Sequence, residues 1–353
     1  MAAFAEALNA AAGELARAGC GPGDMRVLTL SGPEPAALSL ARRPIDRTYR
    51  ETFGGTRPPV KVAAGAAVMV EIEAARPAAP DPAPVWQGLS RAELMREYSP
   101  RGQVPSMRAL FDKWTADGLA WRRSHTATDL FYGPSADETF DLYRPAGSGR
   151  PPVWIFIHGG YWQASGKEQH GQFMQGMLDA GYAVANVDYG LAPETPLERI
   201  VAQIYACVDF IARSGESLGI DSSALHVSGH SAGGHLAAMV ASRADGPPVR
   251  SALLLSGLFD LAPFAHLPMG KIVGLKGAAD IATLSPLGRK CRAARVGVAL
   301  GALESAQFKW QSDEIARAWS AGSPLHLEGA NHFSLLDGLN GGPLLELAKA
   351  TAR

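Results

Sequence analysis

The most constraining feature of this chain is a glycine-flanked serine between a predicted strand and a predicted helix. An apolar run over residues 224–228 leads into residues 229–233, which read Gly-His-Ser-Ala-Gly, and an alanine-rich helical stretch follows. A turn this tight accepts no Cβ on either side of its central residue, which is why glycines flank it. The pattern predicts a nucleophile elbow that exposes the Ser231 hydroxyl at a helix N-terminus, where backbone N–H groups stabilise a developing oxyanion.

A second motif lies upstream, after a continuous apolar run over residues 152–157 that predicts a strand buried on both faces. The next five residues, 158–162, read His-Gly-Gly-Tyr-Trp. A Gly-Gly pair by itself also marks ordinary turns. Together with a nucleophile elbow, a loop of this kind donates N–H groups to an oxyanion hole, alongside the residue after the nucleophile. We therefore expect the N–H groups of Gly160, Tyr161 and Ala232 to form that hole.

A serine nucleophile of this kind needs an acid and a histidine base, which follow it in the chain in that order. Among nine histidines, His332 is the one that follows a predicted last strand and precedes the final helix. Glu304 follows the next-to-last predicted strand and is the expected acid, which holds the imidazole in the right tautomer. Asp260 follows an earlier strand and is the alternative acid, although a helix cap or turn is its plainer role.

Strands and helices alternate after about residue 86, which predicts an α/β fold with a mainly parallel, eight-stranded sheet covered by helices on both faces. The expected strands are residues 126–132, 138–143, 152–157, 182–188, 224–228, 251–256, 296–300 and 323–328. Helices are expected near residues 167–180, 196–214, 231–243, 307–321 and 334–350, and within 88–122. The first two strands should form a hairpin at an antiparallel edge, and residues 258–290 are a candidate small cap over the site.

A proline-rich stretch divides the chain. Residues 77–86 contain Pro77, Pro80, Pro82 and Pro84, a composition typical of an extended, semi-rigid linker. It separates an N-terminal α+β segment, residues 1–76, from the larger domain, residues 87–353.

Composition excludes several classes of function. The net charge is −1 and no basic block stands out, so neither nucleic acid nor an anionic membrane is an expected partner. Three scattered cysteines, Cys20, Cys207 and Cys291, indicate reduced thiols instead of a disulfide framework or a metal site. No apolar run is long enough to cross a bilayer, and the charged N-terminal stretch is typical of an amphipathic helix, not of a signal peptide. A cytoplasmic protein without metal or cofactor is predicted.

These motifs resemble one known family. Residues 87–353 are similar to arylformamidase (kynurenine formamidase), a branch of the α/β-hydrolases near the hormone-sensitive-lipase-like esterases. The resemblance rests on residues 158–163, 229–237, 256–261 and 301–308, with Ser285-Pro286, Gln311-Ser312, Tyr98-Ser99-Pro100 and residues 141–143. That family usually carries Asp at the Glu304 position; Glu also serves as a triad acid in this fold.

The resemblance implies a serine hydrolase that converts an aryl formamide, such as N-formyl-L-kynurenine, to kynurenine and formate. Trp162 and Phe259 are candidates to line the pocket for the aromatic leaving group, although aromatic side chains more often belong to the core. Two alternatives stay open: a carboxylesterase for short-chain acyl esters with the same triad, and a non-catalytic binding protein on a hydrolase fold.

The N-terminal segment resembles the later part of the Rid family of enamine/imine deaminases. In that family an arginine at the Arg57 position grips a substrate carboxylate, and a glutamate at the Glu71 position holds the reactive water. The family's first strands are missing here, so we expect Arg57 and Glu71 to be relics of that activity or structural residues. Two strands and two helices would leave an open sheet edge that must pack on the hydrolase or on another subunit. Because Rid proteins are trimers, the segment is a candidate for homo-oligomerisation. The resemblance rests on residues 18–19, 23–27, 49–53, 57–62 and 70–74.

Overall fold

The computed structural model describes residues 83–353 apart from 105, 126–128 and 148, together with three N-terminal strands and residues 8, 10 and 11. The chain divides into two compact units, Met1–Ala92 and Glu93–Arg353, so the division falls a few residues after the end of the expected linker. Arg57 and Cys20 lie outside the described residues.

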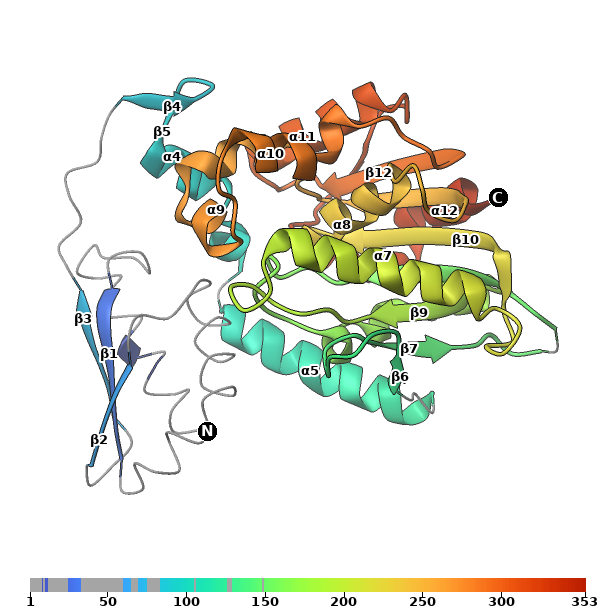
Figure 1. Ribbon diagram of the computed structural model, residues 1–353, viewed down its shortest axis with the longest axis horizontal. Helices are drawn as coiled ribbons and strands as arrows, with labels where there is room; N and C mark the ends of the chain where they lie inside the picture. Colours follow the sequence, from blue (N-terminus) through green and yellow to red (C-terminus); the bar gives the residue numbers. More distant parts are fainter. Residues whose placement is uncertain are drawn as a thin grey trace. The chain divides into compact units, whose positions relative to one another are not determined.

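The N-terminal unit contains a three-stranded sheet in the order β2-β1-β3, one strand more than expected (Figure 1). The central strand runs parallel to β2 and antiparallel to β3. Glu71 lies on β3 opposite Thr29, and its side chain is exposed. The last residues of the expected linker form strand β4, which pairs with β5. The strands are β1 (Met25–Gly32), β2 (Val60–Ala64), β3 (Met69–Ala74), β4 (Pro84–Trp86) and β5 (Leu89–Ser90).

The larger unit is built on an eight-stranded sheet in the order β13-β12-β11-β10-β8-β9-β7-β6. Strand β7 runs antiparallel to both of its neighbours, and all other pairs are parallel. The prediction of a mainly parallel sheet with an antiparallel edge hairpin is confirmed. Its strands are β6 (Asp129–Phe131), β7 (Thr139–Tyr143), β8 (Pro152–Ile157), β9 (Ala183–Val187), β10 (Asp221–His230), β11 (Val249–Leu255), β12 (Arg295–Gly301) and β13 (Leu325–Leu327).

Helices cover both faces of this sheet (Figure 1). Side chains alternate along a strand, so Trp154 and Phe156 of β8 face the cluster formed with α5, α6 and α12. Helices α7 and α8 pack on the opposite face, and all ten residues of α8 are buried. The helices are α5 (Met107–Ser124), α6 (Gln175–Asp179), α7 (Leu197–Arg213), α8 (Ala232–Ala241), α11 (Ala306–Ala318) and α12 (Gly342–Ala352).

Two expected helices are broken into shorter pieces. The segment near residues 167–180 forms η3 (Lys167–Gln169), η4 (Gly171–Phe173) and then α6. A Cβ on Gly171 would lie 2.4 Å from the Trp121 ring, so tight packing against α5 governs this segment. The segment near residues 334–350 is split in the same way into η7 (Ser334–Asn340) and α12.

The insertion expected at residues 258–290 consists of η5 (Ala262–His266), α9 (Pro268–Ile272), α10 (Ala278–Leu284) and η6 (Pro286–Gly288). It packs on the loop after β8, because the Phe264 ring lies within 6.4 Å of the Tyr161 ring and 6.3 Å of the Trp162 ring. The stretch before the sheet supplies α4 (Arg91–Glu97) and η2 (Pro100–Gln103).

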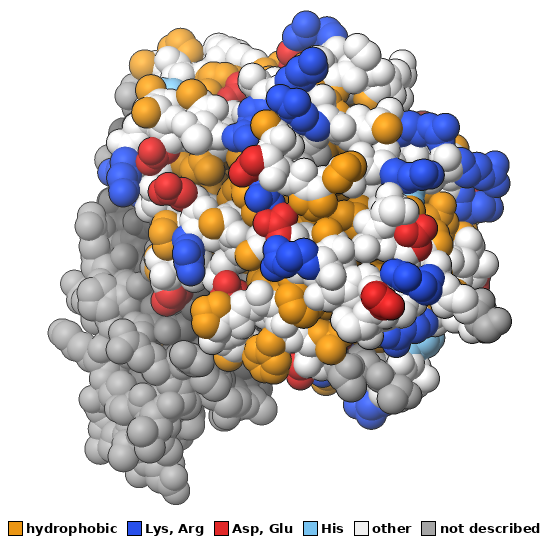
Figure 2. Space-filling model, turned by 45° about the vertical axis from the view of Figure 1, so that its right-hand side comes forward, with side chains coloured by type: hydrophobic (Ala, Val, Ile, Leu, Met, Phe, Trp, Pro, Cys, Tyr) orange, Lys and Arg blue, Asp and Glu red, His pale blue; other side chains and the backbone are white. Residues whose placement is uncertain are grey.

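The described surface carries charges of both signs. Lys and Arg side chains are interspersed with Asp and Glu on the face drawn in Figure 2. Within the described residues, no helix is both long enough and apolar enough to cross a membrane. Cys207 and Cys291 are free thiols, the first buried and the second partly buried.

Candidate active site

Ser231 stands at the turn between β10 and α8 with φ +55° and ψ −118°. A positive φ is strained for a residue with a Cβ, and such strain is concentrated at functional sites. The flanking glycines make the turn feasible: a Cβ on Gly229 would lie 2.1 Å from the Gly233 oxygen, and one on Gly233 would lie 2.0 Å from the Ile157 oxygen. Ser231 N–H donates to the Leu255 oxygen at 2.8 Å, which ties the elbow to β11.

The loop after β8 lies against this elbow. A Cβ on Gly159 would lie 2.9 Å from the His230 oxygen and 3.1 Å from the Ser231 Cβ, so a glycine is needed for this close approach. Gly160 and Tyr161 have φ of +107° and +53°. The loop thus brings its backbone beside the serine, at the carboxyl ends of two neighbouring strands, as the sequence predicts.

Neighbouring hydrogen bonds fix the peptides that carry the expected oxyanion donors. The Gly160 oxygen accepts from Gln163 N and Ala164 N, both at 3.0 Å, and the Ser231 oxygen accepts from His235 N at 3.1 Å. In a trans peptide the N–H points opposite to the C=O, so these bonds orient the N–H groups of Tyr161 and Ala232.

The three N–H groups expected to bind the oxyanion are available for a ligand. Among the described residues, the N–H groups of Gly160, Tyr161 and Ala232 donate to no protein acceptor. Ala232 is fully buried, and buried N–H groups are rarely left without a partner. An N–H that is free of protein acceptors is suited to binding an anionic oxygen.

Glu304 and His332 form a buried pair. His332 Nδ1 lies 2.7 Å from Glu304 Oε2, while Glu304 Oε1 accepts from Ser256 Oγ at 2.5 Å and from Gly301 N at 2.8 Å. Burial raises the pKa of Glu304, but the neighbouring His332 and these hydrogen bonds outweigh it, so the net pKa lies below its usual value. A carboxylate in this setting stays ionised and orients the imidazole through Nδ1, which leaves Nε2 as the nitrogen available to Ser231.

The alternative acid lies elsewhere. Asp260 Oδ1 accepts from Ala262 N at 2.8 Å, at the first residue of η5. The Gln311 side chain accepts from Asp260 N at 2.8 Å and donates to Asp260 O at 2.9 Å. Asp260 therefore has the cap-like role that its sequence context also allowed.

Three further contacts hold the loop that carries His332. Gln103 Oε1 accepts from His332 N at 2.9 Å, and the Gln103 oxygen accepts from Asn331 Nδ2 at 3.3 Å. His230 Nε2 donates to the His332 oxygen at 2.7 Å. Burial, followed by the neighbouring His332, holds the pKa of His230 well below its usual value, so this donor is neutral.

Sequence reasoning missed Gln103, Ser256 and the supporting role of His230. The signal for Ser256 was its place at the carboxyl end of a predicted strand, next to the strand that precedes Glu304. Gln103 carries no signal of its own, because it reaches His332 from a segment that lies more than two hundred residues earlier in the chain.

The two expected pocket residues are both buried in this structure. Trp162 and Phe259 have exposed fractions of 0%, which leaves neither with surface for a substrate in this structure. Trp162 has a positive φ of +58°, and its ring packs edge-on against His235 at 5.1 Å. Tyr161 is the partly exposed aromatic residue of this loop, and its hydroxyl donates to the Tyr98 oxygen.

No metal is indicated at the described residues, where no group of three or more His, Cys, Asp or Glu side chains is placed to hold an ion.

Comparisons with known proteins place this geometry among hydrolases. The family described as BD-FAE matches residues 140–286. A kynurenine formamidase from Danio rerio is 32% identical over 277 residues, which cover 72% of this chain and 93% of that protein. The esterase LipI of Mycobacterium tuberculosis is 36% identical over 107 residues, 29% of this chain and 33% of that protein.

A solved structure agrees over nearly the same span. A putative thioesterase from Silicibacter sp. superposes with a TM-score of 0.65 and 29% identity, covering 71% of this chain and 97% of that one.

Proposed function

The chain belongs to the kynurenine formamidase family of α/β-hydrolases, and from this premise we propose that it hydrolyses an aryl formamide of the N-formyl-L-kynurenine type. The nucleophile is Ser231, the base His332 and the acid Glu304. The observation that carries the proposal is the buried 2.7 Å contact between His332 Nδ1 and Glu304 Oε2 in the unit that also holds the Ser231 elbow.

In the first half of the reaction, His332 Nε2 takes the proton of the Ser231 hydroxyl as Oγ attacks the formyl carbon. The carbonyl oxygen becomes an oxyanion and accepts from the N–H groups of Gly160, Tyr161 and Ala232. His332 then gives its proton to the aniline nitrogen, the C–N bond breaks, and the aromatic amine leaves.

In the second half, a water molecule loses a proton to His332 and attacks the formyl ester on Ser231. The second tetrahedral species collapses, formate leaves, and His332 returns a proton to Ser231 Oγ. Glu304 stabilises the imidazolium in both halves. Its three hydrogen bonds keep it ionised and in place while the charge on His332 appears and disappears.

A short-chain carboxylesterase is the second candidate, and the similarity to esterase LipI over 107 residues favours it specifically. The same serine, histidine and acid would act on an ester. The two reactions differ in the leaving group, since an aniline nitrogen must be protonated as it departs whereas an activated phenolate need not be.

Parallel kinetics on N-formyl-L-kynurenine and p-nitrophenyl acetate test the proposal, with the Ser231→Ala variant as the matched control. We expect the larger kcat/KM on the formamide and no turnover of either substrate by the variant. Turnover of the ester alone would favour the esterase. Turnover of neither substrate would leave a binding protein on a hydrolase fold.

A further inference from the structure

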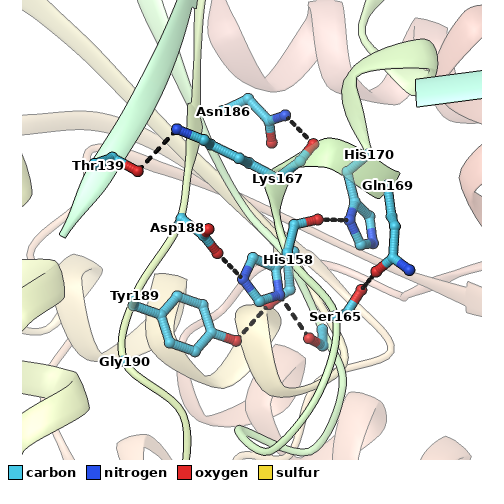
Figure 3. A network of polar contacts seen from close by, with 12 residues as sticks. Thr139, His158, Ser165, Lys167, Gln169, His170, Asn186, Asp188, Tyr189 and Gly190 are labelled. Atoms are coloured by element: carbon cyan, nitrogen blue, oxygen red, sulfur yellow. Dashed lines mark hydrogen bonds and ion pairs between the residues drawn. The ribbon is translucent and has the colours of Figure 1, made fainter. Parts of the chain in front are cut away.

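A second histidine–carboxylate pair lies beneath the loop after β8 (Figure 3). His158 follows β8, and Asp188 follows the neighbouring strand β9. The His158 side chain has an exposed fraction of 0%, and both of its ring nitrogens have partners. Nδ1 lies 2.7 Å from the Gly159 oxygen, and Nε2 lies 3.0 Å from Asp188 Oδ1.

These partners determine where the protons lie. A backbone carbonyl only accepts hydrogen bonds, so Nδ1 must carry a proton. Nε2 faces a carboxylate oxygen, and one proton must lie between them for the contact to be attractive. Held on Nε2, this proton gives an imidazolium beside the Asp188 carboxylate, with both ring nitrogens donating to acceptors.

The other titratable groups around the ring are compatible with one cation. The ring of His170 stacks at 5.6 Å, and burial, followed by the charge of His158, lowers the pKa of His170 to about 3. The ring of Tyr189 stacks at 4.3 Å and 9°, and burial raises its pKa well above the usual value. Both are therefore neutral, and an aromatic face below a cation is favourable.

Two further charged side chains lie in this region. Lys167 Nζ donates to Thr139 Oγ1 at 2.8 Å (Figure 3) and also to Asp129. A Cβ on Gly166 would lie 2.8 Å from Glu168 Oε2 and 3.4 Å from Asp188 Oδ1, so both carboxylates lie near this glycine. His230, on the far side of Gly159, is the neutral donor to His332 described above. Asp188 is thus the anion in direct contact with His158.

The hydrogen bond from His158 Nδ1 also fixes the peptide between Gly159 and Gly160. This peptide is trans, so the Gly160 N–H points away from the oxygen that His158 holds. The preceding carbonyl, that of His158 itself, accepts from the Tyr189 hydroxyl at 2.9 Å. Two successive peptides of the loop are therefore held by hydrogen bonds from the His158 and Tyr189 side chains. The Gly160 N–H points away from these two side chains.

We propose that Asp188 holds His158 as an imidazolium, and that this pair positions the Gly160 N–H for the oxyanion. The role rests on the proposed function, in which Gly160 is an oxyanion donor. Neither residue touches the reacting atoms; both are positioning residues. The charge on His158 strengthens its hydrogen bond to the Gly159 oxygen and adds a positive potential behind the oxyanion hole.

The protonation state is tested on the unmodified enzyme by two-bond ¹H–¹⁵N spectra of ¹⁵N-histidine-labelled protein, with His158 assigned by the signal missing from His158→Asn. We expect both His158 nitrogens to be protonated at neutral pH. One unprotonated nitrogen would overturn the proposal. This measurement needs no turnover, so it stands even where the wild-type enzyme hydrolyses neither substrate and the proposed function fails.

The positioning role is tested with two variants of matched shape. His158→Asn keeps an N–H donor near the Nδ1 position, whereas His158→Leu removes it. We expect kcat on both N-formyl-L-kynurenine and p-nitrophenyl acetate to fall about 100-fold in His158→Leu, the effect of losing one oxyanion donor, with KM nearly unchanged. His158→Asn should recover most of that loss. Equal losses of kcat in the two variants, or a rise in KM with kcat unchanged, would show that His158 packs the loop and does not position the oxyanion donor.

Discussion

Among the described residues, two histidine–carboxylate pairs look alike but differ in how the histidine ring nitrogens are used. His332 lies 2.7 Å from Glu304, and His158 lies 3.0 Å from Asp188; both rings are buried at the carboxyl ends of strands in the same sheet. His332 meets its carboxylate through Nδ1, and in the proposed mechanism its Nε2 takes the reacting proton. Both ring nitrogens of His158 are hydrogen-bonded to acceptors. The two proposed roles, a base and a positioning group, therefore differ in the number of engaged ring nitrogens and not in the presence of a carboxylate.

The two carboxylates differ as well. Glu304 is fully buried and receives hydrogen bonds from Ser256 and Gly301 besides its contact with His332. Asp188 keeps an exposed fraction of 19% for its side chain. A buried carboxylate with fixed donors suits a charge that comes and goes on His332. A partly hydrated one suits a permanent ion pair.

The largest effect is expected from removing the Ser231 hydroxyl, which in the proposed mechanism gives its proton to His332 Nε2. Ser231→Ala should lower kcat on the formamide by about 10⁶-fold, as loss of a serine nucleophile does in other triads. The unfolding midpoint should change little, because the elbow geometry is fixed by the glycines and by the backbone bond to Leu255. Stopped assays with circular dichroism as the folding control measure both. Near-wild-type turnover would rule out Ser231 as the nucleophile.

The next largest effect is expected from changing the carboxylate of each histidine–carboxylate pair, and it compares the two pairs. Glu304→Gln should lower kcat by about 10⁴-fold, since an amide in the acid's place favours the wrong tautomer of the base. Asp188→Asn should cost less than about 100-fold, because it acts on the oxyanion through His158 and a backbone peptide. Steady-state kcat of the two variants on one substrate decides the matter. Equal losses would mean that the two pairs are not functionally distinct.

The parts of this arrangement that could be predicted from the sequence are those fixed by the ends of strands. Ser231, Glu304 and His332 each follow an apolar run, and the ends of parallel strands meet at one edge of a sheet. Asp188 also follows such a run, yet the tyrosine and glycine after it give no familiar pattern. Gln103 could not be found in this way, because its contact with His332 depends on how η2 packs.

The burial of Trp162 could not be foreseen for a different reason. Sequence alone does not tell to which side of an irregular loop a side chain points. The positive φ values at Tyr161 and Trp162 differ from those of an ordinary strand, and the Trp162 ring ends up in the core beside His235. Phe259 is likewise buried, in the segment whose backbone N–H groups Gln311 binds.

A smaller effect is expected at Tyr161, whose N–H is the second proposed oxyanion donor of the loop that His158 anchors. Tyr161→Phe removes the hydroxyl bound to the Tyr98 oxygen and should lower kcat about tenfold by loosening the Tyr161 N–H. Tyr98→Phe is the matched control, because it keeps the backbone oxygen that receives this bond. We expect a smaller loss in the control. A larger loss in Tyr98→Phe would shift the role from the loop to the network of Tyr98 with Gln311.

The pH dependence of stability tests whether two buried histidines outside these pairs are neutral. Burial lowers the pKa of His226 and of His235 to about 4, so the unfolded chain binds more protons than the folded one between about pH 6.5 and 4. The free energy of unfolding should therefore fall as the pH drops through this window. His226 bonds to Ser251 away from the candidate site, and His226→Gln should flatten the slope. Urea titrations at several pH values measure it; an unchanged slope would contradict this assignment.

The smallest expected effect concerns the N-terminal segment. Both pairs lie in the Glu93–Arg353 unit, so removing residues 1–80 should leave turnover per active site unchanged. A phosphonate titration supplies the number of active sites, and light scattering reports any change in oligomeric state. A truncated chain that labels fully at Ser231 yet hydrolyses nothing would assign part of the catalytic machinery to that segment.

One labelling measurement tests whether Ser231 opens an aryl formamide with His332 as its base. The enzyme is inactivated in steps with a fluorophosphonate, and the digested protein is analysed by mass spectrometry beside residual activity on N-formyl-L-kynurenine. We expect a single adduct on the peptide containing Ser231, formed in proportion to the formamidase activity lost. Full labelling of Ser231 with formamide turnover intact, or inactivation with the adduct on another residue, would contradict it.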